Sequence, residues 1–247
     1  MIYITGDCHG DYERFKSDIF FECNEMTKDD YVIICGDFGL WNESKEQDER
    51  LDWLESRPYT TLWVDGNHEN YDLLNTYKTE MWHGGKVHFI RPSVIHLQRG
   101  QIFEIQGKTF FTFGGASSHD ISGGILEPHD PDFFEQLEKA RRQPRPFRIN
   151  HVSWWKEELP SEDEMEEGRS NLKKVNHKVD YIVTHCASSS IQAILSFGMY
   201  QRDMLTDYLE EIKNMVEYQV WFFGHYHDNK KITNQDILLY EQIIRIL

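Results

Sequence analysis

Five short apolar runs in this chain each end at a glycine or polar segment that carries metal-binding side chains. The runs are Ile2–Ile4, Tyr31–Cys35, Leu62–Val64, Tyr181–Val183 and Val220–Phe223. Short runs rich in β-branched and aromatic residues that stop at glycine or a polar residue are typical of buried strands. Ligand sites of open α/β sheets lie beyond the carboxyl ends of the strands. We therefore expect the five segments that follow these runs to meet at one place.

Seven candidate ligand side chains follow these runs. They are Asp7, His9, Asp37, Asn67, His185, His225 and His227. Their oxygen and nitrogen atoms suit manganese, iron, zinc or nickel, and the thiolates of a structural zinc site are missing from the set. Seven ligands are too many for one catalytic ion with an open position, but they suit two ions if one carboxylate bridges them. The alternative, that each residue only caps a strand, is reasonable for one Asp or His and weak for seven.

The order of apolar patterns predicts an α/β fold. Over residues 1–76 we expect strands at 2–5, 31–35 and 60–64, with helices near 11–22, 43–55 and 70–76. Alternating strands and helices imply parallel strands joined by right-handed crossovers. Residues 86–114 read as short strands without helices, with a hairpin turn at Gln106-Gly107-Lys108, and they form a second sheet or extend the first. A strand to His185, a helix near 200–217, a strand to His225 and a hairpin over 230–247 complete the chain.

Residues 115–178 form the least regular part of the chain. Glycines and prolines bracket two charged helical stretches, near 131–143 and 161–176, and the second opens with the capping-box pattern Ser161 and Glu164. The apolar residues of this segment are too few for an independent core. We therefore expect one domain over residues 1–247, with residues 115–178 inserted beside or over the active site.

The charge and hydropathy of the chain restrict its partners and its location. A formal net charge of -16 disfavours binding to nucleic acid or anionic lipid, which requires a basic face. A nucleotide substrate stays open, because bound metals supply local positive charge. The apolar runs are too short to span a membrane, and the start of the chain lacks the pattern of a signal peptide. We expect a cytoplasmic protein; the sequence does not indicate an oligomeric state.

The motifs, taken in order, resemble those of the calcineurin-like metallophosphoesterase superfamily. The matching segments are Asp7-Cys8-His9, Gly36-Asp37, Gly66-Asn67-His68-Glu69, His185 and Gly224-His225-Tyr226-His227. The resemblance implies a four-layer αββα sandwich with two divalent ions, manganese preferred, and hydrolysis by a hydroxide that bridges them. It implies that Asp7, His9 and His227 hold the first ion, that Asn67, His185 and His225 hold the second, and that Asp37 bridges both. It also implies that His68 contacts the phosphate and protonates the leaving oxygen.

Departures from the family patterns narrow the range of expected substrates. Serine/threonine phosphatases of this superfamily carry an arginine after the second strand, where this chain has Phe38-Gly39-Leu40-Trp41-Asn42. Lariat-debranching relatives have a cysteine in place of Asp7. A phosphoprotein phosphatase and a debranching enzyme are therefore disfavoured, and we expect a small-molecule or nucleotide phosphomonoester or phosphodiester as substrate. The alternatives are a non-catalytic nucleotide- or partner-binding protein on the same fold, and a nuclease.

Three further residues are candidates for contact with the substrate. Trp41 and Tyr226 adjoin motif residues, so we expect them to form walls of the substrate site. His119 follows a glycine- and serine-rich turn at a strand end, from which it can approach the metals. The remaining histidines outside the motifs are expected to be surface or core residues.

Overall fold

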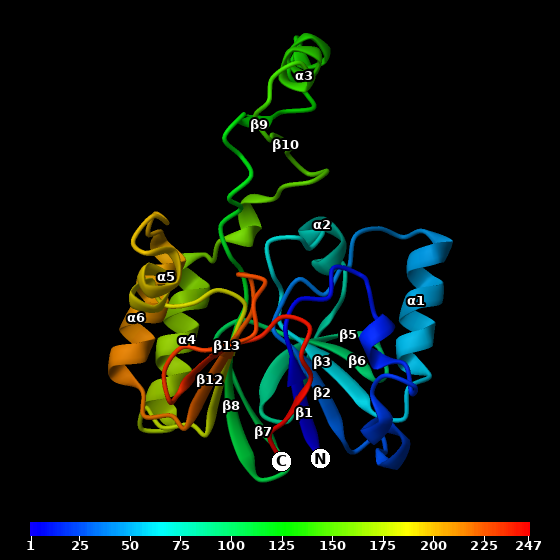
Figure 1. Cartoon of the computed structure of the whole chain (residues 1–247), viewed down its shortest axis with the longest axis vertical. Helices are drawn as coiled ribbons and strands as arrows, with labels where there is room; N and C mark the ends of the chain where they lie inside the picture. The colour runs from blue at the N-terminus through cyan, green and yellow to red at the C-terminus, as the bar shows by residue number, and fades with distance from the viewer.

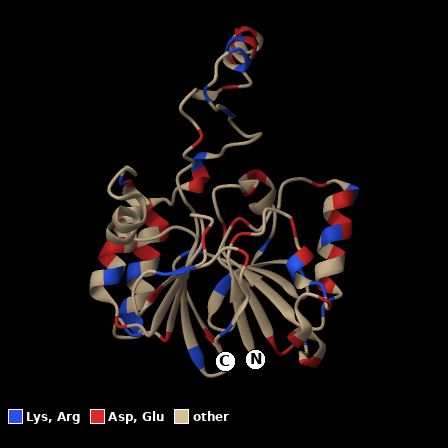
Figure 2. Ribbon diagram, in the orientation of Figure 1, with Lys and Arg blue, Asp and Glu red and all other residues tan.

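A computed structural model describes all residues 1–247 and shows two β-sheets packed face to face, with helices on the outer side of each sheet (Figure 1). This is the αββα sandwich that the motifs imply. Charged residues lie mostly on the helices and loops, and the strands carry few of them (Figure 2). None of the helices combines the length and the apolar character that crossing a membrane requires.

The first sheet has seven strands in the order β15-β1-β2-β3-β6-β5-β4. They are β1 (Ile2–Thr5), β2 (Tyr31–Ile34), β3 (Thr60–Trp63), β4 (Thr79–Trp82), β5 (Gly85–Arg91), β6 (Val94–Leu97) and β15 (Ile244–Arg245). The neighbours β1, β2, β3 and β6 run parallel, whereas β4, β5 and β15 pair antiparallel. Helix α1 (Lys45–Glu55) covers its outer face, and α2 (Tyr71–Leu74) adds residues to the same core cluster.

The second sheet has six strands in the order β13-β14-β12-β11-β8-β7. They are β7 (Gln101–Ile105), β8 (Lys108–Phe113), β11 (Tyr181–Thr184), β12 (Val220–Phe223), β13 (Lys230–Lys231) and β14 (Asp236–Leu238). Helices α4 (Glu162–Lys174), α5 (Ser189–Ser196) and α6 (Met204–Met215) cover its outer face with a shared apolar cluster. Between the sheets lies a third cluster with Ile33, Leu62, Phe103, Val183 and Phe222 at 2% exposure or less.

Most predicted elements are confirmed, and one differs. The turn at Gln106-Gly107 joins β7 to β8, and both of its residues have positive φ, as a tight hairpin requires. The expected helix over 11–22 is wrong: the chain forms two short 3₁₀ turns, η1 (Glu13–Phe15) and η2 (Phe21–Glu25), separated by extended backbone at Lys16. One helix would place its apolar residues on a single face, whereas Phe15 is buried and Ile19 is 57% exposed.

The strands of residues 86–114 divide between the two sheets. Strands β5 and β6 extend the first sheet, and β7 and β8 form one edge of the second. Strand β4 and helix α5 have no counterpart among the predicted elements. The C-terminal hairpin of β13 and β14 is present, and the chain then returns to the first sheet as β15.

The irregular segment 115–178 divides into two parts in the structure. We call residues 119–154 the arm: β9 (Ile125–Leu126), α3 (Phe133–Arg141) and β10 (Arg148–Ile149) project beyond the sandwich (Figure 1). The chain returns through η3 (Lys156–Glu158) and enters α4, whose capping box at Ser161 and Glu164 is formed. Helix α3 buries no residue, whereas Met165 and Leu172 of α4 lie in the core of the second sheet.

Candidate metal centre

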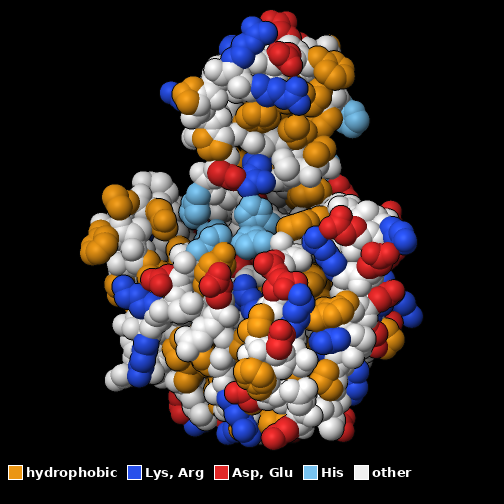
Figure 3. Space-filling model, turned by 45° about the vertical axis from the view of Figure 1, so that its right-hand side comes forward, with side chains coloured by type: hydrophobic (Ala, Val, Ile, Leu, Met, Phe, Trp, Pro, Cys, Tyr) orange, Lys and Arg blue, Asp and Glu red, His pale blue; other side chains and the backbone are white.

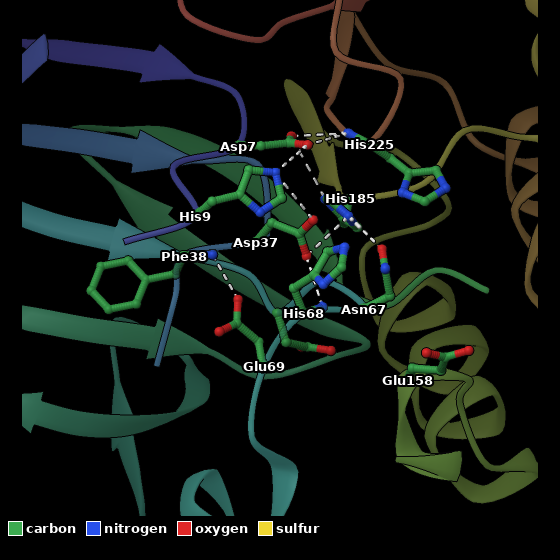
Figure 4. Close-up of polar contacts among 12 residues, drawn as sticks. Asp7, His9, Asp37, Phe38, Asn67, His68, Glu69, Glu158, His185 and His225 are labelled. Atoms are coloured by element: carbon green, nitrogen blue, oxygen red, sulfur yellow. Dashed lines mark hydrogen bonds and ion pairs between the residues drawn. The ribbon is translucent and has the colours of Figure 1, made fainter. Parts of the chain in front are cut away.

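The ends of five parallel strands place the predicted ligands at one edge of the sandwich (Figure 4). Asp7, Asp37 and Asn67 follow β1, β2 and β3 of the first sheet. His185 and His225 follow β11 and β12 of the second sheet. The two sheets therefore contribute side chains to the same site, at the foot of the arm.

One group of four side chains is compact enough to hold a metal ion. Candidate ligand atoms of Asp7, His9, Asp37 and His227 all lie within 4.8 Å of one another. The Nε2 atoms of His9 and His227 are 3.0 Å apart, and His227 Nε2 is 3.1 Å from Asp7 Oδ2. The hydrogen bond to Asp7 raises the pKa of His227. Carboxylates and imidazoles that converge in this way favour a positive charge between them.

A second group forms around the other oxygen of Asp37. Its Oδ1 lies 3.4 Å from His185 Nε2, and the same nitrogen lies 3.3 Å from Asn67 Oδ1. His185 Nδ1 donates to the carbonyl oxygen of Cys35 at 2.8 Å, so in the neutral ring Nε2 carries a lone pair that faces two oxygen acceptors. Burial opposes a charge on His185, but Asp37 and Asp7 outweigh it and raise its pKa to about 10. A cation among these acceptors replaces that proton, so the donor set fits a metal ion.

His225 is held by its backbone and pairs with His119. Its backbone N–H donates to both oxygens of Asp7, at 2.9 and 3.1 Å. Its ring packs edge-on against His185, with centroids 5.0 Å apart. Its Nε2, however, lies 3.0 Å from His119 Nε2, and the ring of His119 stacks on Tyr200. The structure therefore places His119 at the site, beside an expected ligand of the second ion.

Four of the predicted ligands have left-handed backbone conformations. Their φ angles are 49° at His9, 45° at Asp37, 70° at His225 and 49° at His227. Such conformations of non-glycine residues cost about 1–3 kcal/mol each and occur mainly at functional sites. Such conformations persist only where the surrounding contacts determine them.

Two motif glycines are required by close packing against the carboxylates. A Cβ atom on Gly66 would lie 2.0 Å from Asp37 Oδ1, and one on Gly224 would lie 2.0 Å from Asp7 Oδ1. Any side chain at these positions would displace a carboxylate. The glycines therefore belong to the site, although they bind nothing themselves.

His68 and Trp41 lie beside the first group. The backbone N–H of His68 donates to Asp37 Oδ1 at 3.0 Å, and Trp41 Nε1 donates to the His68 carbonyl at 2.8 Å. The ring of His68 is edge-on to His9, with centroids 5.3 Å apart. Burial lowers the pKa of His68, and Asp37 opposes this shift. Contact with a phosphate dianion would raise that pKa again.

Glu69 has a structural role that the sequence did not indicate. Its buried carboxylate accepts three backbone hydrogen bonds, from Phe38, Gly39 and Leu40, at 2.6, 3.1 and 3.0 Å. Burial raises its pKa to about 8. These bonds hold the loop that follows Asp37 (Figure 4). In the sequence, Glu69 stands out only as the last residue of the motif Gly66-Asn67-His68-Glu69, which does not reveal this role.

A groove of about 580 Å³ opens from the first group and is lined by His9, Tyr12, Trp41, Arg50 and Trp53 among others. Trp41 is 39% exposed there. Tyr226, the second expected wall residue, is partly buried and packs against the core of the second sheet, with its hydroxyl 3.3 Å from Cys186 Sγ. Figure 3 shows histidine side chains gathered at the surface below the arm.

Comparison with known proteins agrees with this geometry. A family model described as calcineurin-like phosphoesterase matches residues 1–229. The chain is also similar to lariat debranching enzyme A of Xenopus laevis, with 25% identity over 150 residues. That match covers 53% of this chain and 27% of the relative, so the chain spans only about a quarter of the relative's length. Because the family model covers nearly the whole sequence, the chain belongs to the calcineurin-like phosphoesterases, a family of divalent-metal-dependent hydrolases of phosphoesters.

Proposed function

We propose that the chain hydrolyses a small-molecule or nucleotide phosphomonoester or phosphodiester at a dinuclear site, with manganese as the preferred metal. The observation that carries this proposal is the position of Asp37. Its Oδ2 lies 3.7 Å from His9 Nε2, and its Oδ1 lies 3.4 Å from His185 Nε2. A carboxylate that bridges two ions must present one oxygen to each group of ligands, and Asp37 does so.

The residues divide the chemistry among them. Asp7, His9 and His227 would hold one ion, Asn67, His185 and His225 the other, and the pair, when bound, would supply an activated water and positive charge for the phosphate oxygens. His68, on the same face as His9, would bind a phosphate oxygen and give its proton to the leaving oxygen. The hydrogen bond from the His68 backbone N–H to Asp37 fixes the backbone from which this ring extends.

The groove beside His9 favours a compact leaving group of low charge. Trp41 offers an aromatic surface. The charge of Arg50 is partly neutralised by Glu46, to whose carboxylate Arg50 Nη2 donates at 2.6 Å. The groove also contains Asp11, Glu13, Glu49 and a lysine that pairs with Glu13, Lys16. Acidic groups outnumber basic ones there, so the wall disfavours a polyanion. With the net charge of -16, this supports a single phosphoester of a sugar, nucleoside or aryl group over nucleic acid.

Metal-dependent turnover tests the proposal. Metal-free protein should be inactive toward 4-nitrophenyl phosphate, bis(4-nitrophenyl) phosphate, nucleoside monophosphates and cyclic dinucleotides, and added Mn²⁺ should restore turnover of at least one. Asp37→Asn should lose bound metal together with activity. His68→Ala should bind Mn²⁺ normally and lose about 10²–10⁴-fold in rate, most steeply for substrates with poor leaving groups. A manganese-loaded protein that is inert toward every substrate would overturn the proposal.

The same screen separates the alternatives. Tight nucleotide binding without turnover would favour a non-catalytic binding protein. The similarity to a lariat debranching enzyme makes nucleic acid a second substrate class to include. Cleavage of single-stranded DNA, single-stranded RNA or a lariat at rates above those for the small esters would favour a nuclease.

A further inference from the structure

We propose that Ser118 and Glu158 are positioning residues that orient the Asn67 amide so that its oxygen faces the second ion. This inference rests on the proposed role of Asn67 as a ligand. Neither residue belongs to a motif, and they lie 40 positions apart, on the two sides of the arm.

The three side chains form one hydrogen-bonded series with a defined direction. Asn67 Nδ2 donates to Ser118 Oγ at 3.4 Å. Ser118 then donates twice to the Glu158 carboxylate, from its backbone N–H at 2.9 Å and from its hydroxyl at 2.6 Å. All three residues are at most 5% exposed.

This direction determines which way the amide is turned. A serine hydroxyl has one proton, and here that proton is given to Glu158, so Ser118 Oγ meets Asn67 as an acceptor. An acceptor attracts the NH₂ group of the amide and repels its oxygen. Asn67 Oδ1 is therefore directed to the other side, where it lies 3.3 Å from His185 Nε2. A flipped amide would present NH₂ to the cation instead.

Contacts with the sandwich hold the backbone of η3, which carries Glu158. The buried Arg99 donates to the carbonyl of Glu157 at 2.8 Å and pairs with the buried Asp65. A Cβ atom on Gly115 would lie 2.5 Å from the Glu158 carbonyl oxygen, so the turn before Ser118 packs directly on η3. A buried carboxylate is unfavourable unless hydrogen bonds compensate for lost hydration, and Ser118 donates two such bonds to Glu158.

Manganese titration by calorimetry tests the inference, with Ser117→Ala as the matched control. Ser117 lies in the same turn, and its side chain makes no hydrogen bond. We expect Ser118→Ala to weaken binding of the second Mn²⁺ by about 10–100-fold, as loss of a hydrogen-bond partner behind a ligand typically does. Glu158→Gln should act in the same direction, because its NH₂ group must face one of the two Ser118 donors. Ser117→Ala should stay within about twofold of wild type.

A comparison with Asn67→Ala separates positioning from general loss of structure. If Ser118 acts through Asn67, Ser118→Ala should have no further effect on manganese affinity in the Asn67→Ala background. An equal loss in both backgrounds, or unchanged affinities in Ser118→Ala, would overturn the inference. Wild-type protein that binds a single ion would instead overturn the dinuclear function itself. Circular dichroism and thermal unfolding of each variant verify that the fold is retained.

Discussion

Asp37, the proposed bridging ligand, illustrates how much support a single side chain of the site has. Both of its oxygens face ligand groups, its backbone is left-handed at φ 45°, and the three residues that follow it are held by Glu69. A strained residue stays in place only when its surroundings determine its conformation. The precision of the metal centre therefore depends on residues that never touch a metal.

Replacing Glu69 by glutamine should lower both stability and turnover. The glutamine NH₂ group cannot accept from the backbone donors of Phe38, Gly39 and Leu40, so at least one buried N–H is left unpaired. We expect the free energy of unfolding to fall by about 1–3 kcal/mol and manganese-dependent turnover to fall by about 10–100-fold. Chemical denaturation and initial rates measure the two effects.

Glu80→Gln is the control for this variant, because Glu80 is exposed on β4. It should match wild type in both assays. Wild-type stability and turnover in Glu69→Gln would contradict the role given to Glu69.

At the level of elements, a buried polar network joins β3, β5 and β6. Asp65, two residues after the end of β3, accepts from His96 Nε2 at 3.1 Å and from Arg99 Nη2 at 2.6 Å. Because His96 gives its Nε2 proton to Asp65, its Nδ1 is an acceptor, and His88 Nδ1 must donate to it across 3.2 Å. Because Arg99 lies between β6 and β7, the network links strands of the first sheet to the segment that leads into the second sheet. It lies close to the loop that carries Asn67.

His88 makes stability depend on pH. Burial, and then the neighbouring His96, lower the pKa of His88 to about 4, below about 6.5 in an unfolded chain. Between these values the unfolded chain binds more protons than the folded one, so stability falls as the pH falls from about 6.5 to 4. The loss should be about 2–3 kcal/mol at most, measured by denaturation at pH 7 and pH 4.5.

His88→Leu should reduce this pH dependence, because one titrating group is removed while the other buried histidines remain. His129→Leu, at an exposed position of the arm, is the control and should retain the wild-type slope. Equal slopes in His88→Leu and wild type would contradict the assignment.

For the whole molecule, the arm is the feature that distinguishes this sandwich. It projects from the edge of the sheets where the ligands gather (Figures 1 and 3), and Asp120 and Arg148 pair at its base. Its helix α3 contributes nothing to the core. We propose that the arm, as an insertion beside the site, restricts the size of substrates that reach the metals.

Shortening the arm tests this proposal. Gly123 N donates to the Pro146 carbonyl at 2.7 Å, so a short glycine-serine linker can replace residues 124–145. We expect the thermal midpoint to shift by no more than about 4 °C, since the removed part packs little against the sandwich. The ratio of turnover on a bulky phosphodiester to turnover on 4-nitrophenyl phosphate should rise. An unchanged ratio would contradict the proposed restriction.

The pattern of the sequence by itself determined an α/β fold and the edge at which Asp7, Asp37, Asn67, His185 and His225 meet, and the αββα sandwich came from the resemblance of the motifs to a known family. The edge could be predicted because each of these residues follows a buried strand within a few positions, and parallel strands deliver such residues to the same edge. The pairing of His119 with His225, the support of Asp37 by Glu69 and the series from Glu158 to Asn67 were decided only by the tertiary structure. These contacts join residues about 30 to 106 positions apart, and their hydrogen-bond directions depend on burial and donor geometry that no local pattern encodes.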